Sequence, residues 1–179
     1  MQKENLSEIV ESQSSFIQPG IHEVLISKME LHENEGISSF IEMIFTNSKE
    51  QTVSNRFYYD SGSDEESSNR RKRTLGQLKH ISTKIVKETD FNDTYNNAKT
   101  LSDFTNSLSK LILNKSVRIK FIGKEIPGKD GKSNWFKATI GGKVFAENIQ
   151  QVPSLLTFDP NNKWDMKRLP VETEKTFEI

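Results

Sequence analysis

The stretch 115–148 constrains the fold more than any other part of this 179-residue chain, because apolar and polar side chains alternate along two long runs. A period of two gives a strand one apolar face and one solvent-facing face. The linking segment contains the turn formers Pro127, Gly128 and Gly131, so the sequence predicts a β-hairpin. The apolar positions that we expect to pack inward are Val117, Ile119, Phe121, Phe136, Ala138 and Ile140.

The outer face of this predicted hairpin is basic and aromatic. Bases stack on aromatic rings and phosphates attract Lys and Arg, so the pattern predicts a platform for single-stranded nucleic acid. Large aromatic residues in strands are more often buried than ligand-facing, which leaves core packing of Trp135 open as the alternative. The candidate binding residues are Arg118, Lys120, Trp135 and Lys137 on the strands, with Lys129 and Lys132 at the tip of the turn.

Three further strands are predicted in the first third of the chain, separated by polar turns, and together they indicate an antiparallel meander. In the third of them, Arg56 and Tyr58 share a face, and we expect both to join the basic and aromatic platform. For Tyr58, as for Trp135, burial in the core is the alternative. The three predicted strands span Ile21–Glu33, Ser38–Thr46 and Thr52–Asp60.

Two helices are predicted between the third and fourth strands. The first follows a flexible loop at 61–69 and begins at the basic run, with Asn69 as its cap. The second opens at Thr100, whose spacing to Asp103 is that of a capping box, and the segment 87–99 between the helices is expected to be irregular. Cations at a helix N-terminus oppose its dipole, so the basic run is either a phosphate grip or a solvated helix start. This run is Arg70, Arg71, Lys72 and Arg73.

The charge is segregated although the chain carries 25 basic and 25 acidic side chains. Residues 1–69 have a net charge of −9, residues 70–143 of +11 and residues 144–179 of −2. A basic region can attract a polyanion even when the whole protein is neutral. The alternative is that a neutral, mixed surface only keeps the protein in solution.

Enzymatic chemistry finds little support in the residues. The chain has no cysteine, and its histidines (His22, His32 and His80) show no metal-ligand spacing with carboxylates. The glycines at 128 and 131 and at 141 and 142 lack the lysine-bearing pattern of a phosphate loop. We therefore expect no catalytic residues, no metal and no cofactor. The sequence also lacks an apolar run of membrane-spanning length and a signal-peptide core, which predicts a cytoplasmic protein without a membrane partner.

The order of three strands, a helical insert and two strands resembles that of an OB-fold barrel. Within residues 19–149 the chain looks like a phage-encoded single-stranded DNA-binding protein of the OB-fold type. Three stretches carry the resemblance: PGIHEVLISKMELHE, RFYYD with the following RRKRTLGQLKHI, and LNKSVRIKFIGKE with GKSNWFKATIGG.

The resemblance implies a mainly β fold, with a five-stranded barrel, helices between its third and fourth strands, and an extended C-terminal arm. It also implies a protein that coats single-stranded DNA, without sequence preference, during phage DNA replication or recombination in the host cytoplasm. Two alternatives stay open. An OB-like barrel can serve a structural or adaptor protein through protein contacts, and the same surface chemistry suits an RNA-binding OB domain.

The predicted organisation is a flexible lead-in at 1–18, the OB-fold domain at 19–149 and a tail or arm at 150–179. Proteins of this type often end in an acidic tail with a terminal hydrophobe that recruits replication proteins. Here the chain ends in the mildly acidic VETEKTFEI. The tail is therefore a candidate for binding replication proteins, for exchange between subunits of a homo-oligomer, or for covering the binding groove.

Overall fold

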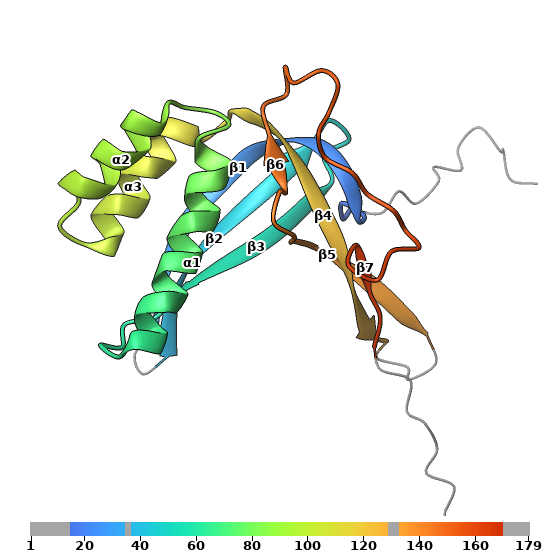
Figure 1. Cartoon of the computed structure of the whole chain (residues 1–179), viewed down its shortest axis with the longest axis horizontal. Helices are drawn as coiled ribbons and strands as arrows, with labels where there is room; N and C mark the ends of the chain where they lie inside the picture. The colour runs from blue at the N-terminus through green and yellow to red at the C-terminus, as the bar shows by residue number, and fades with distance from the viewer. Residues whose placement is uncertain (1–14, 35–36, 129–132, 170–179) are drawn as a thin grey trace, which may run out of the picture.

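A computed structural model of the chain describes residues 15–34, 37–128 and 133–169. These residues form one seven-stranded sheet with three helices beside it (Figure 1). The elements in chain order are β1 (Gly20–Asn34), β2 (Ile37–Asn47), β3 (Thr52–Tyr59), α1 (Glu65–Ser82), α2 (Glu88–Asn97), α3 (Leu101–Ile112), β4 (Ser116–Pro127), β5 (Asn134–Ile140), β6 (Ala146–Glu147) and β7 (Met166–Lys167).

The main strand order is β3-β2-β1-β4-β5, and the short strands β6 and β7 both pair with β4. All pairings are antiparallel except that of β7. The predicted meander and hairpin are confirmed, and so is the position of the helices between the third and fourth strands. The fold is thus mainly β, and its sheet is not closed into a barrel, because no ladder joins β3 to β5 among the residues that the structure describes.

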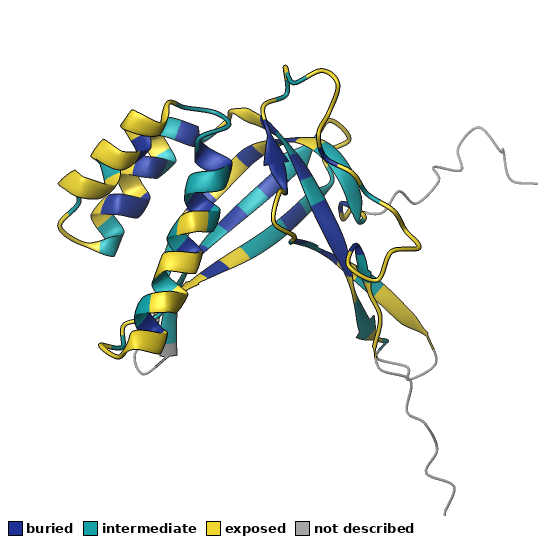
Figure 2. Ribbon diagram, viewed as in Figure 1, coloured by how far each residue is buried: buried dark blue, intermediate teal, exposed yellow. Residues whose placement is uncertain are grey.

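The hydrophobic core lies between the inner face of the sheet and helices α1 and α3 (Figure 2). Cross-strand partners such as Ile26 and Phe45, or Ile41 and Phe57, are buried there. The predicted inward positions of β4 are confirmed. Full burial of a large apolar side chain contributes about 1.5–3 kcal/mol, which makes this shared face the main source of stability. The buried β4 residues are Val117, Ile119 and Phe121, and the helices add Leu78, Ile81, Phe104, Leu108 and Ile112.

Helix α1 begins five residues earlier than predicted. Its cap is Asp64 rather than Asn69, and the Asp64 carboxylate accepts a hydrogen bond of 2.8 Å from the backbone N–H of Ser67. Glu65 and Glu66 then occupy the first turn, where negative charge is favourable beside the positive end of the helix dipole. The flexible loop predicted over 61–69 is therefore wrong in its second half, and the basic run lies inside the helix instead of at its start.

Helix α2 occupies most of the segment that was predicted to be irregular. Its apolar content is low, and a tertiary contact explains why it forms: Phe91 packs edge-on against Phe104 of α3, with ring centroids 5.8 Å apart. The predicted second helix is confirmed as α3. Its Thr100 cap accepts a hydrogen bond from the N–H of Asp103.

After β5 the chain turns back and follows β4, and we call this segment, residues 144–169, the C-terminal arm (orange to red in Figure 1). Gly123 of β4 permits this close approach, because a Cβ there would lie 2.5 Å from the Sδ atom of Met166. The predicted tail residues 170–179, including the ending VETEKTFEI, lie outside the described residues. Within the described part of the chain, no helix is both long and apolar enough to cross a membrane.

Candidate nucleic-acid interface

A groove runs between β3 and β5, the two ends of the main strand order. It consists of two adjoining hollows of about 550 Å³ each, which share Ser54, Ile126 and Lys137 in their lining. One hollow is mainly apolar and the other is polar. We call the whole depression the β3–β5 groove. Its apolar hollow is further lined by Phe16, Ile17, Gln18, Thr52, Val53, Trp135, Phe136 and Ala138, and its polar hollow by Glu42, Asn55, Arg56, Tyr58, Lys124 and Thr139.

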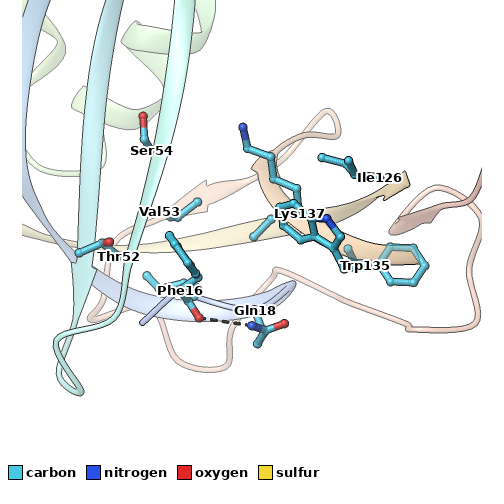
Figure 3. A pocket seen from close by; sticks show the side chains of 11 residues that line it. Phe16, Gln18, Thr52, Val53, Ser54, Ile126, Trp135 and Lys137 are labelled. Carbon is cyan, nitrogen blue, oxygen red and sulfur yellow. Dashed lines mark hydrogen bonds between the residues drawn. The ribbon is translucent and has the colours of Figure 1, made fainter. Parts of the chain in front are cut away.

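The candidate side chains of each strand share one face and line the groove, Arg56 and Tyr58 from β3 and Trp135 and Lys137 from β5. Trp135 and Lys137 leave β5 on the same face, and Figure 3 shows them across the apolar hollow from Phe16. The amide oxygen of Asn55 bridges the two strands. It accepts hydrogen bonds from the Thr139 hydroxyl at 3.0 Å and from the Ile140 N–H at 3.3 Å. This bridge sets the separation of the two walls of the groove, since no backbone ladder joins β3 and β5 among the described residues.

Aromatic surface is exposed along the groove. Trp135 is 52% exposed and Tyr58 is 53% exposed, so the alternative of core packing is wrong for both. Phe16, which sequence reasoning placed in the lead-in and did not single out, is 67% exposed at the apolar end. Phe16 is held there because the next residue, Ile17, is buried and donates its backbone N–H to the Thr52 carbonyl at 3.0 Å. Exposed aromatic rings beside a cleft are the stacking surfaces that unpaired bases use.

Arg56 lies in the polar hollow, but an acidic neighbour partly neutralises it. Its Nε atom is 3.5 Å from a Glu42 carboxylate oxygen, and its guanidinium stands 4.8 Å above the ring of Phe40. Glu42 also accepts a 2.6 Å hydrogen bond from Ser54. That bond, with the nearby Arg56, lowers the pKa of Glu42 despite its partial burial, so the carboxylate stays charged beside Arg56. The position of Arg56 is as predicted, while its charge is shared with Glu42.

Two lysines supply unshared positive charge. Lys124 of β4 and Lys137 of β5 are paired across the ladder, exposed, and without an ion pair to any described residue. Like charges directly opposite each other on neighbouring strands are destabilising, so nothing in the fold itself favours this pair. Lys137 was predicted, and Lys124 was missed although the same alternation places it on the outer face of the predicted hairpin.

Arg118 does not belong to the groove, which corrects the sequence prediction. Its side chain is 15% exposed and forms ion pairs with Glu147 at 2.6 Å and Glu23 at 2.8 Å. It also donates hydrogen bonds to the carbonyls of Ile149 and Gln151. The outward face of β4 at this level is covered by the C-terminal arm, so Arg118 anchors the arm and is not available to a phosphate.

Lys120 is likewise removed from the candidate interface. Its Nζ atom is 2.9 Å from Asp165, and both side chains are nearly buried. The second oxygen of the Asp165 carboxylate accepts the N–H of Asp159, and the Asp165 carbonyl accepts the N–H of Gly123 at 2.7 Å. These bonds fasten the far end of the arm to β4.

Acid is expected to loosen this attachment. Burial raises the pKa of Asp165, but the bonds from Lys120 and from the Asp159 N–H more than offset it and hold the pKa below the usual 3.8. A carboxyl with a depressed pKa contributes stability that is present above its unfolded pKa and is lost as the pH falls through its folded pKa. Urea denaturation should therefore give a lower free energy of unfolding at about pH 3 than at about pH 5. Asp165→Asn should show a smaller decrease, and an equal decrease in both proteins would contradict this assignment.

The basic run of α1 makes mostly local contacts. Arg70 pairs with Asp60 at 3.1 Å and with Glu66, and Arg71 donates to the carbonyls of Asp60 and Gly62. These bonds tie the helix to the end of β3. Lys72 and Arg73 are exposed and form no ion pair with a described residue, but none of the four lines the β3–β5 groove. Lys129 and Lys132 lie outside the described residues.

No group of three or more His, Asp or Glu side chains within residues 15–34, 37–128 and 133–169 is arranged to hold a metal ion. The structure brings together Arg56, Tyr58, Trp135 and Lys137 among the predicted residues, and it adds Phe16 and Lys124. No protein-family model and no curated protein matches the chain.

Proposed function

We propose that the β3–β5 groove binds single-stranded nucleic acid without sequence preference. The observation that carries the proposal is the meeting of exposed aromatic rings with lysines that have no ion pair to a described residue, in one groove. Trp135, Tyr58 and Phe16 offer ring faces, and Lys124 and Lys137 offer charge to phosphates. Every base has a face that can stack, so this combination gives affinity that tolerates any sequence.

The arrangement of the strands supports an OB-type interpretation of the fold. The main order β3-β2-β1-β4-β5, with helices inserted between the third and fourth strands, is the order expected of a five-stranded, partly open Greek-key barrel. The Asn55 bridge lies where such a barrel would close. Under this proposal the chain acts as the resemblance implies: it coats single-stranded DNA in phage DNA replication or recombination, in the cytoplasm of the host and without catalysis.

Fluorescence anisotropy of a labelled oligo-dT strand, titrated with the protein at low and moderate salt, tests the proposal. We expect binding that an unlabelled duplex of equal length does not displace. Arg56, Lys124 and Lys137 are the cations of the groove, and each phosphate contact on a single strand contributes about −0.7 to the slope of log affinity against log salt. The expected slope for a strand confined to the groove is therefore about −2.

The outcomes separate the candidate functions. Displacement by duplex, or no binding at low salt, would overturn the single-strand proposal and favour the adaptor alternative. Preference for an oligo-U strand over oligo-dT would transfer the proposal to RNA, because a ribose hydroxyl would then be part of the recognition.

A further inference from the structure

A second aromatic and basic surface lies on the C-terminal arm. Trp164 is 68% exposed, and the Nζ atom of Lys163 stands 5.4 Å from its ring. These residues line a hollow of about 490 Å³ together with Lys167 and Arg168. We call Lys163, Trp164, Lys167 and Arg168 the arm surface.

The arm surface is held on a fixed turn. The N–H of Trp164 donates to the side-chain oxygen of Asn162 at 2.9 Å, and the next residue is the buried Asp165 that pairs with Lys120. Asp165 is the only acidic residue between 163 and 168, and its carboxylate points inward, where Lys120 neutralises it. Around this turn the chain carries three cations and one exposed indole ring, which complement a polyanion that carries stacking bases.

A row of lysines joins the arm surface to the β3–β5 groove. Lys167 of β7 pairs with Lys124 of β4, and Lys124 pairs with Lys137 of β5. Side chains at paired positions leave a sheet on the same face, and neighbouring strands are about 4.8 Å apart, so the row spans about 10 Å. None of the three forms an ion pair with a described residue. Three like charges abreast are unfavourable in the protein alone, and a bound polyanion would neutralise them.

A second contact links the arm surface to the groove, between Arg168, which directly follows β7, and Phe136 of β5. The guanidinium of Arg168 lies 5.7 Å from the ring centroid of Phe136, which lines the apolar hollow of the groove. The arm surface and the groove are therefore continuous through both the lysine row and this pair.

We propose that the arm surface is a second segment of the binding site, in which a single strand leaves the groove, crosses the lysine row and stacks a base on Trp164. The proposal rests on the proposed function of the groove and deepens it, because it assigns a footprint longer than the groove. An acidic peptide would also suit the charge of the arm surface, but the continuity with the groove favours the same nucleic-acid strand.

Single-tryptophan variants test the proposal directly, because the chain has two tryptophans, one in each region. Trp135→Phe leaves Trp164 as the only indole, and Trp164→Phe leaves Trp135. Each is titrated with a short oligo-dT of roughly 4 nucleotides and a long one of roughly 16, the limits of OB-fold site sizes. We expect the short strand to quench Trp135 alone and the long strand to quench both.

Affinity gives a second measure. Trp164→Ala should weaken binding of the long strand about tenfold and leave binding of the short strand within about twofold, since one stacked base is lost. Trp164→Phe should retain most of the affinity. Leu155→Ala, which removes another exposed apolar side chain from the same arm, is the matched control and should change neither affinity.

The failures of the two proposals are distinguishable. If both strands quench Trp135 and neither quenches Trp164, the groove function stands and the arm proposal falls. If neither strand quenches either indole or binds by anisotropy, the function of the groove falls and the arm proposal with it. Quenching of Trp164 by the short strand as strong as that of Trp135 would overturn a continuous path, since the arm would then bind independently.

Discussion

Replacing Trp135 and Lys137 together with alanine is expected to weaken binding of oligo-dT about a hundredfold. Loss of one stacked base costs about 1–3 kcal/mol, or roughly 5- to 150-fold, and loss of a phosphate contact adds to it. Both side chains are exposed, so the melting temperature should stay within about 2 °C of the parent value. Anisotropy titration and thermal denaturation of the same sample measure the two quantities.

A matched pair on the helices controls for loss of an aromatic ring and a lysine in general. Tyr95 of α2 and Lys99, which follows that helix, are exposed and line a different hollow, so replacing both with alanine should leave oligo-dT affinity within about twofold. If the β5 double variant binds as the parent protein does, the groove is not the interface. If both double variants lose affinity equally, the groove is not distinguished from the rest of the surface.

Arg118→Ala is expected to destabilise the fold without removing a groove contact. It leaves Glu147 nearly buried without its cation and strips the carbonyls of Ile149 and Gln151 of their donor. Removing one partner of a desolvated ion pair is strongly destabilising. The effect is moderated here because Arg118 keeps some exposure and its other partner, Glu23, is exposed to solvent. We expect the melting temperature to fall by roughly 5 °C or more, measured by circular dichroism.

Comparison with Lys137→Ala, a change in the groove itself, separates a role of Arg118 in stability from a role in binding. At a temperature where the variant is folded, affinity for a short oligo-dT should stay within about twofold of the parent value, while Lys137→Ala weakens binding without loss of stability. Lys115, an exposed lysine directly before β4 with no ion pair to a described residue, is the control, and its alanine variant should change neither property. Loss of affinity without loss of stability in Arg118→Ala would restore it to the interface.

The strands show which features of the fold the local sequence pattern can predict. Alternation in the stretch 115–148 places Val117, Ile119 and Phe121 inside, and the structure confirms this, because the geometry of a strand depends only on neighbouring residues. The Thr100 cap is of the same kind, since its hydrogen bond joins residues three apart. Helix α2 could not be predicted in this way, because it forms by packing against α3. The residues of α2 alone do not specify that contact.

The sequence by itself determined the succession of the five long strands along the chain, the place of the helical insert and the sides of β4 and β5 on which basic and aromatic residues lie. Only the tertiary structure decided which of those residues face a ligand. Arg118, Lys120, Lys124 and Lys137 are equivalent in the alternation, yet the first two pair with carboxylates 29 and 45 residues farther along the chain. Those carboxylates lie in the C-terminal arm, which has no periodic pattern, and its position depends on the buried ion pairs themselves.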